Sequence, residues 1–255
     1  MDNIHVLVKK LDNALDKTDK SFVRRFVGNL SKALINTKLN EKAIITNKIQ
    51  ELYIAYFGRA ADPDGLDDWV NKGWKGVKEF SDTIPTQAEF KSVYSNLSNK
   101  NQIKQIYKNL FNRYTNDQNI IAFWTSHFKD KVFDLAYIVN YTIQHIKYAQ
   151  RFSEYFTLED HHRLNNKTKA AVAYTDQVRK TTRGKLAYTP ESIDPFVEGD
   201  ALKLAKSFIT GIDISKSLYY DSADLNDKAD NSVKDIINIS ELNTSLKEKK
   251  EALEK

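Results

Sequence analysis

The stretch "ELYIAYFGRAADPDGLDDWV" (residues 51–70) decides how this chain folds. Its apolar residues keep helical spacing up to Phe57, and Asp62-Pro63-Asp64-Gly65 is a turn signal before a second helix. Four aspartates fall within seven residues, 62–68, so the turn either binds a metal ion or only joins two helices. An EF-hand loop needs other glycine and glutamate positions, so calcium binding is the weaker alternative.

The turn has a structural explanation in its residue types. Pro63 sets φ for a turn, Gly65 permits a positive φ, and Asp62 or Asp64 can cap the second helix. We expect residues 67 and 68, both aspartates, in the first turn of that helix, where negative charge suits the helix dipole. We therefore predict a helix cap at this turn.

The same pattern occurs twice. "IQELYIAYFGRAADPDGLDDW" (residues 49–69) aligns with "IKQIYKNLFNRYTNDQNIIAFW" (residues 103–124), and the second copy departs from the first at Asn112 and in its turn. The aligned pairs are Ile49 with Ile103, Tyr53 with Tyr107, Phe57 with Phe111, Arg59 with Arg113 and Trp69 with Trp124. Tandem units of this kind bury their apolar faces against each other.

The remaining chain is also helical in pattern. It has only eight glycines and four prolines, and apolar residues recur at helical spacing in the segment 135–149. This segment carries a second row, Tyr137, Tyr141, Gln144 and Tyr148, which can stack on sugar rings but is better explained by core packing. The sequence predicts an all-α, multi-helix domain built on a helix-turn-helix repeat.

We divide the chain into four parts. Residues 1–48 are N-terminal helices packing on the core, and residues 49–160 are the two tandem helical repeats. Residues 161–230 form a C-terminal helical part, and residues 231–255 are an amphipathic helix or a linker to a missing downstream region.

Charge and apolar content limit the partners. A net charge of +5 is far below that of a dedicated nucleic-acid binder, and we expect no nucleic acid. No apolar run is long enough to span a membrane, and the N-terminus lacks the pattern of a secretory signal. Residues 163–185 hold seven basic residues against one acid, Asp176, and form either an anion-binding face or a solvated helix surface.

No motif points to catalysis. The chain has no cysteine, phosphate loop, zinc-protease helix or serine elbow. A glycosidase could use Glu154 with Asp160, or residues 67 and 68, but neighbouring carboxylates on a helix rarely face each other across a cleft. His161 and the histidine after it point about 100° apart on a helix, so they do not simply share a metal. We predict no enzyme and no resident metal or cofactor.

One motif set joins both helices of the first copy to a later segment: Leu52-Tyr53, Phe57-Gly58-Arg59, Asp62-Pro63-Asp64-Gly65-Leu66, Trp69 and Ala88-Glu89-Phe90. This set resembles the tandem helical domain of unknown function near the N-termini of type I-secreted S-layer and haemolysin-type calcium-binding proteins. Residues 163–178 and 188–225 are similar to the segment that follows in those proteins, and phycobilisome linker domains are a more distant comparison.

The resemblance implies an extracellular protein of the outer cell surface or S-layer, exported through a signal at its far C-terminus. Calcium would bind glycine-rich repeats in a missing downstream region. In such S-layer proteins the N-terminal helical part anchors the lattice to lipopolysaccharide, chiefly to its O-antigen sugars. The resemblance thus implies a non-catalytic anchoring module that binds this glycan.

The sequence offers six candidate glycan contacts, chosen as aromatic or basic side chains near turns and in the basic segment. They are Trp74, Lys75, Tyr114, His161, Arg163 and Lys167. An alternative function is protein–protein assembly of an extracellular lattice, with the leucine face at residues 242–253 contacting neighbouring copies. An apolar patch rather than a basic aromatic groove on the folded surface would favour this alternative.

Overall fold

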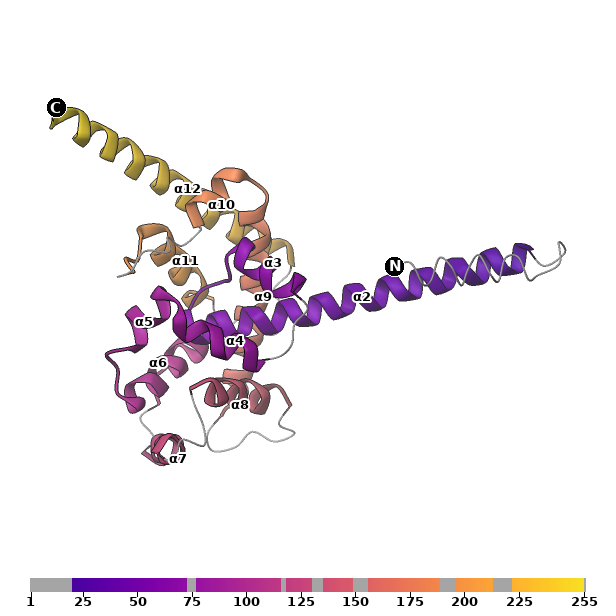
Figure 1. Ribbon diagram of the computed structural model, residues 1–255, viewed down its shortest axis with the longest axis horizontal. Helices are drawn as coiled ribbons and strands as arrows, with labels where there is room; N and C mark the ends of the chain where they lie inside the picture. Colours follow the sequence, from indigo (N-terminus) through magenta and orange to yellow (C-terminus); the bar gives the residue numbers. More distant parts are fainter. Residues whose placement is uncertain are drawn as a thin grey trace. The chain divides into compact units, whose positions relative to one another are not determined.

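The computed structural model describes residues 20–72, 77–115, 118–129, 135–148, 156–188, 196–212 and 222–254 (Figure 1). Within these ranges the chain is helical with connecting loops and contains no strand, which confirms the all-α prediction. None of the described helices is both long enough and apolar enough to cross a membrane. The chain divides into two compact units, residues 1–45 and 46–255, and the repeats lie in the second.

The helices follow one another in this order: α2 (Lys20–Phe57), α3 (Pro63–Asn71), α4 (Val77–Thr83), the 3-10 turn η1 (Ile84–Thr86), α5 (Ala88–Tyr94), α6 (Asn99–Phe111), α7 (Gln118–Lys129), α8 (Leu135–Tyr148), α9 (Leu158–Arg179), α10 (Thr182–Tyr188), α11 (Asp200–Thr210) and α12 (Ser222–Leu253). The boundaries that we expected after residues 48, 160 and 230 fall inside α2, α9 and α12.

Helix α9 is the centre of the second unit. Its neighbours in space are α3, α6, α8, α10, α11 and α12. It begins with a capping box, in which Thr157 Oγ1 accepts from the Asp160 N–H (3.1 Å) and the Asp160 carboxylate accepts from the Thr157 N–H (2.9 Å). Because α9 packs on so many neighbours, even its polar residues, such as Asn166 and Thr175, are buried.

The turn after the first repeat helix is a helix cap, as predicted. The Asp62 carboxylate accepts a hydrogen bond from the Gly65 N–H (2.9 Å), and Pro63 opens α3. The positive φ that we expected at Gly65 is wrong, because this residue is helical and Gly58 instead adopts φ 67°. Gly65 is small for another reason: a Cβ there would lie 2.7 Å from both Asp62 Oδ2 and Tyr53 Oη.

The two later aspartates also differ from expectation. The acidic residue in the first turn of α3 is Asp64, and residues 67 and 68 lie beyond that turn. Asp67 forms an ion pair with Arg179 of α9 (2.7 Å), and Asp68 pairs with Lys72 one turn later (2.5 Å). Asp67 therefore joins α3 to α9, whereas Asp68 pairs with the C-cap residue of α3 itself.

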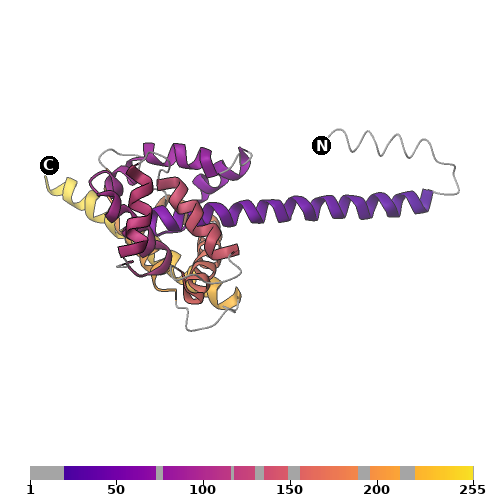
Figure 2. The same cartoon turned by 90° about the horizontal axis from the view of Figure 1, so that it is seen from below.

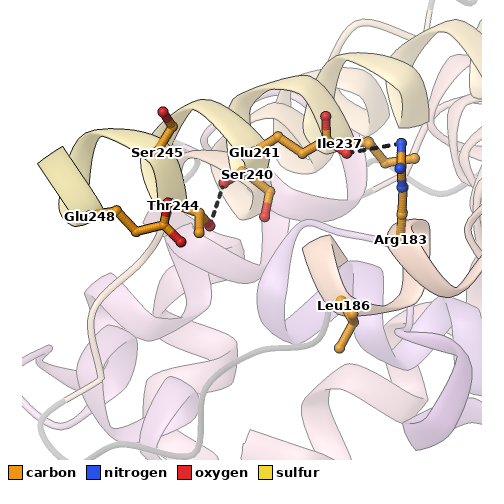
Figure 3. Close-up of a pocket in the computed structure, with 8 residues that line it drawn as sticks. All are labelled: Arg183, Leu186, Ile237, Ser240, Glu241, Thr244, Ser245 and Glu248. Atoms are coloured by element: carbon orange, nitrogen blue, oxygen red, sulfur yellow. Dashed lines mark hydrogen bonds and ion pairs between the residues drawn. The ribbon is translucent and has the colours of Figure 1, made fainter.

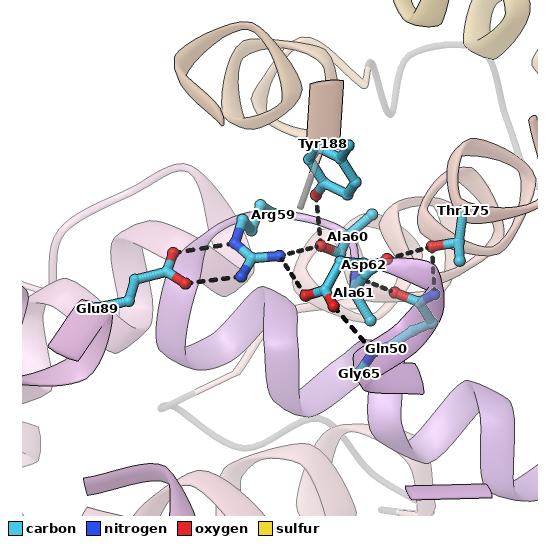
Figure 4. Close-up of polar contacts among 9 residues, drawn as sticks. All are labelled: Gln50, Arg59, Ala60, Ala61, Asp62, Gly65, Glu89, Thr175 and Tyr188. Carbon is cyan, nitrogen blue, oxygen red and sulfur yellow. Dashed lines mark hydrogen bonds and ion pairs between the residues drawn. The ribbon is translucent and has the colours of Figure 1, made fainter. Parts of the chain in front are cut away.

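Arg59 is the polar centre of the first repeat (Figure 4). Its guanidinium is almost completely buried and binds both oxygens of Glu89 on α5, with Nε–Oε1 at 2.9 Å and Nη2–Oε2 at 2.6 Å. Burial alone would lower the pKa of Arg59, but the negative charge of Glu89 raises it above its ordinary value. A paired buried guanidinium is stable, whereas an unpaired one would cost several kcal/mol, roughly 3–5.

Four side chains form hydrogen bonds with the backbone of the loop between α2 and α3. Arg59 Nη1 (2.9 Å) and the Tyr188 hydroxyl (2.5 Å) donate to the carbonyl of residue 60. Gln50 accepts from the N–H of residue 61 (2.8 Å), and the Thr175 hydroxyl donates to the carbonyl of the same residue (2.6 Å). Buried backbone groups need such partners, so this loop ties α2, α9 and α10 together.

The second repeat reproduces this frame. Helix α6 ends at Asn112, whose φ of 55° matches the left-handed conformation of Gly58, and asparagine tolerates that conformation better than most residues. Arg113 then binds both oxygens of Asp160, with Nε–Oδ1 at 2.9 Å and Nη2–Oδ2 at 2.5 Å. The departure at position 112 therefore preserves the geometry of the helix end.

Both arginines lie near the rings of their own repeat helix. Arg59 lies 5.3 Å from the Tyr53 ring centre and 5.4 Å from that of Phe57. Arg113 lies 5.7 Å from the ring centre of Tyr107 and the same distance from that of Phe111. Each repeat thus uses one guanidinium to join a carboxylate to two aromatic rings.

We predict that Glu89→Ala lowers the free energy of unfolding by about 3–5 kcal/mol, because it leaves the buried Arg59 charge unpaired. Asp68→Ala, which removes an exposed ion pair, should cost about 0–1 kcal/mol. Urea unfolding followed by circular dichroism measures both values. Equal losses in the two variants would contradict a central role for Glu89.

Candidate functional site

An aromatic pocket of about 160 Å³ lies in the second repeat, between α6, α7 and α8. We call it the aromatic pocket. Its lining residues are Tyr107, Ile120, Phe123, Trp124, Tyr141, His145 and Phe156. The described lining therefore consists of aromatic rings and one aliphatic side chain.

Helical spacing brings these side chains together. Ile120, Phe123 and Trp124 are three and four residues apart on α7, so they share one face. Tyr141 and His145 are one turn apart on α8, and Tyr107 comes from the buried face of α6. Arg113, just after the end of α6, binds Asp160, as Arg59 binds Glu89 in the first repeat. This ion pair fixes the end of the helix that forms one wall of the pocket.

The rings of the pocket contact one another in ordered geometries. Tyr141 stacks on His145 with ring centres 4.0 Å apart and packs edge-on against Trp124 at 5.3 Å. Tyr107 stacks on Phe156 at 5.9 Å. These contacts preorganise the walls, so a ligand would not have to order them on binding.

A hydrogen-bonded pair supplies the polar atoms of one wall. Tyr141 Oη and His145 Nε2 are 2.9 Å apart. Burial, with the nearby Tyr137, raises the pKa of Tyr141, so its hydroxyl remains protonated at neutral pH. The pair can offer one hydrogen bond to a ligand at the edge of the pocket, while the other walls offer rings.

Two partly exposed aromatic side chains lie at the pocket, Phe123 in its lining and Tyr137 beside the lining residue Tyr141. Tyr137 is 41% exposed and Phe123 is 42% exposed, and the Tyr137 ring stacks on that of Tyr141 at 6.0 Å. We had expected core packing for the row that contains Tyr137 and Tyr141. The structure buries the other face of α8, including Ile138 and Thr142, and leaves this row partly in solvent.

A second, more polar groove lies between α10 and α12 (Figure 3). Its volume is about 270 Å³, and Arg183 on α10 pairs with Glu241 on α12 at 3.2 Å. The other lining residues are Leu186, Ile237, Ser240, Thr244, Ser245 and Glu248. The groove holds no aromatic ring among its lining residues, so it offers no stacking surface for a sugar.

Of the predicted glycan contacts that the structure describes, none is among the residues that line either cavity. Trp74 and Lys75 lie outside the described residues. Tyr114 is 56% exposed just after α6, and the Lys108 ammonium lies 5.4 Å from its ring centre. Tyr114 is therefore a free aromatic face beside a cation, separate from the aromatic pocket.

The three candidates on α9 are engaged within the protein. His161 Nδ1 lies 2.8 Å from the Ile146 carbonyl, and Arg163 pairs with Glu159 at 2.6 Å. Lys167 is 1% exposed, and its ammonium donates to the carbonyl of residue 109 (2.5 Å) and to Asn112 Oδ1 (2.7 Å). The burial of Lys167 leaves it no surface for a glycan, and its role is to bind the C-terminal end of α6.

The three arginines of the basic segment 163–185 form ion pairs with carboxylates of the same protein. Besides Arg163, two of its arginines form ion pairs: Arg179 with residues 67 and 176, and Arg183 with Glu241. Lys167 is buried. These contacts favour a surface of internal ion pairs over a dedicated anion-binding face.

The carboxylates of the glycosidase alternative have structural partners. Asp160 binds Arg113 and closes the cap of α9, and Glu154 lies outside the described residues. Across the described ranges, no cluster of three or more histidine, aspartate or glutamate side chains has the arrangement of a metal site. Asp62, which the calcium alternative needs, is engaged by the Gly65 N–H and by Arg59.

Sequence reasoning identified Tyr107, Trp124 and Tyr141 but not the pocket that they share. The repeat contained the signal, because it aligned Tyr107 and Trp124 with the first-copy residues Tyr53 and Trp69. The pocket also needs α8 to pack beside Tyr107 and Trp124, and no local sequence pattern encodes that contact.

Comparison with known proteins adds no relative. No family model matches the chain, and neither a curated protein nor a solved structure matches it.

The pKa of Lys167 generates a prediction about stability. Burial, and then the charges of Arg163 and Lys108, lower this pKa from 10.5 to about 7. Between these values the unfolded chain binds more protons than the folded chain, so the free energy of unfolding rises with pH by up to about 1.4 kcal/mol per unit. The penalty is fully present below pH 7 and is relieved as the pH rises.

Lys167→Met should abolish this rise, whereas Lys169→Met, an exposed change on the same helix, should preserve it. Urea unfolding at a series of pH values from 6 to 9 measures the slope for all three proteins. A slope that Lys167→Met leaves unchanged would show that Lys167 keeps its ordinary pKa.

Proposed function

We propose that the chain is a non-catalytic module that anchors an S-layer or related secreted protein to the cell surface by binding the O-antigen of lipopolysaccharide. The observation that carries this proposal is the row of exposed rings at the mouth of the aromatic pocket. Tyr137 on α8 and Phe123 on α7 are 41% and 42% exposed, and the Tyr141 ring next to Tyr137 lines the pocket. Sugar rings bind such faces through their apolar C–H groups, and the Tyr141–His145 pair adds a hydrogen bond at the edge.

Charge has a smaller part in this proposal than the sequence suggested. The arginines of the basic segment are occupied by internal ion pairs, whereas Tyr114 with Lys108 remains a second aromatic face beside a cation. We therefore place the main glycan contact on the α7–α8 surface and keep Tyr114 as a secondary contact. Export from the cell and an extracellular location belong to the same proposal.

A second candidate function is lattice assembly through protein–protein contacts. Residues 241–253 of α12 are all exposed and carry Leu242, Leu246 and Leu253, which are 61%, 62% and 88% exposed. Figure 2 shows the yellow C-terminal end of α12 extending past its neighbouring helices. Leucines at this spacing on a solvated helix favour contact with another protein surface.

Binding of the purified 255-residue protein to smooth and to rough lipopolysaccharide, each with calcium and with chelator, tests the proposal. We expect binding to the smooth form alone. Tyr137→Ala should weaken it about 2- to 10-fold, since one aromatic contact contributes about 0.5–1.5 kcal/mol. Leu186→Ala, an exposed apolar truncation on α10, is the matched control and should have no effect.

Binding to neither form would refute glycan anchoring and leave assembly as the function to test. Equal binding to smooth and rough forms would place the ligand outside the O-antigen. Loss of binding with chelator would bring back a calcium site near residues 62–68.

A further inference from the structure

The two repeats differ in what lies next to their aligned tyrosine and tryptophan residues. In the first repeat, Phe80 of α4 occupies this space. Its ring centre lies 5.7 Å from that of Tyr53 and 4.8 Å from that of Trp69, and its side chain is fully buried. The first repeat therefore holds a phenyl ring between these two residues.

The aligned residues of the second repeat are Tyr107 and Trp124, and both line the aromatic pocket. The frame that sets their positions is the same in both copies: a left-handed helix end, then an arginine bound to a carboxylate. Phe156 stacks on Tyr107 and Tyr141 packs edge-on against Trp124, but these four rings still leave a cavity of about 160 Å³ among them. We compare this cavity with the space that the Phe80 ring takes in the first copy. A dry apolar cavity of about 150 Å³ is large enough to take up benzene.

We propose that the aromatic pocket binds one uncharged aromatic ring, the side chain of a phenylalanine or tyrosine presented by a partner protein. The first repeat shows the fit, because Phe80 supplies such a ring from within the chain. The exposed Phe123 and Tyr137 add an apolar rim around the opening. Buried aromatic anchors inside a rim that excludes water are the usual source of binding energy between proteins.

The chemistry of the walls favours a phenyl ring over a sugar inside the pocket. The Tyr141 hydroxyl and His145 Nε2 already bond to each other, and the other lining residues contribute rings and one isoleucine. A pyranose in this space would bury several hydroxyls without partners, each costing about 1–3 kcal/mol. The inference thus goes beyond glycan binding, which uses the exposed ring faces outside the pocket.

Titration of the 255-residue protein with N-acetyl-L-phenylalaninamide and with p-cresol tests the inference. The readout is the NMR signal of the Trp124 indole N–H, identified with a Trp124→Phe variant. We expect saturable binding in the millimolar range, at least about tenfold tighter than for N-acetyl-L-leucinamide or methyl α-D-glucopyranoside.

Two matched variants locate the site. Ile120→Phe places a ring in the pocket and should abolish binding of the phenyl probes. Ala122→Phe adds the same ring to the exposed side of α7 and should leave binding unchanged. Phe80→Leu vacates part of the corresponding space in the first repeat and should create a second site, reported by the Trp69 indole.

Absence of saturable binding would overturn the inference, as would equal binding by the wild type and Ile120→Phe. Methyl glucoside binding as tight as that of the phenyl probes would also overturn it and make the pocket part of the glycan site. Lipopolysaccharide binding by the same variants is measured separately, so failure of ring binding and failure of glycan binding are distinguishable.

Discussion

The buried pair of Arg59 and Glu89 is the interaction on which the described fold depends. A guanidinium that is 2% exposed is tolerated only with a carboxylate and further acceptors around it. Glu89, Asp62 and a loop carbonyl provide them, and in doing so they join the end of α2 to α5 and to the start of α3. The loop between residues 58 and 62 is thereby placed where α9 and α10 can bond to its backbone.

Duplication of this frame allows one copy to change. In the second repeat, Arg113 is 38% exposed on its side chain, and its partner Asp160 also caps α9. The pair therefore anchors the central helix instead of closing a core. Nearby, the rings of Tyr107, Phe156, Trp124 and Tyr141 leave a pocket between α6, α7 and α8. In the part of the chain that the structure describes, the two copies thus share one arrangement of helix end and arginine pair, and the second copy carries an aromatic pocket beside it.

Local patterns predicted the all-α class, the repeat and the cap at Asp62, because capping and helical spacing act over a few residues. They did not predict the Arg59–Glu89 and Arg113–Asp160 pairs, whose members are 30 and 47 residues apart. Gly65 looked like a turn glycine, but its smallness serves contact with Tyr53. Lys167 looked like a surface cation, and only the packing of α9 against α6 reveals that it is buried.

The central claim is that both repeats share one frame, filled by Phe80 in the first copy and open in the second. A crystal of the protein under xenon pressure tests it most directly, since xenon enters apolar cavities of this size. The account predicts one anomalous peak between Tyr107 and Trp124 and none between Tyr53 and Trp69. A peak in both places, or none between Tyr107 and Trp124, would contradict it.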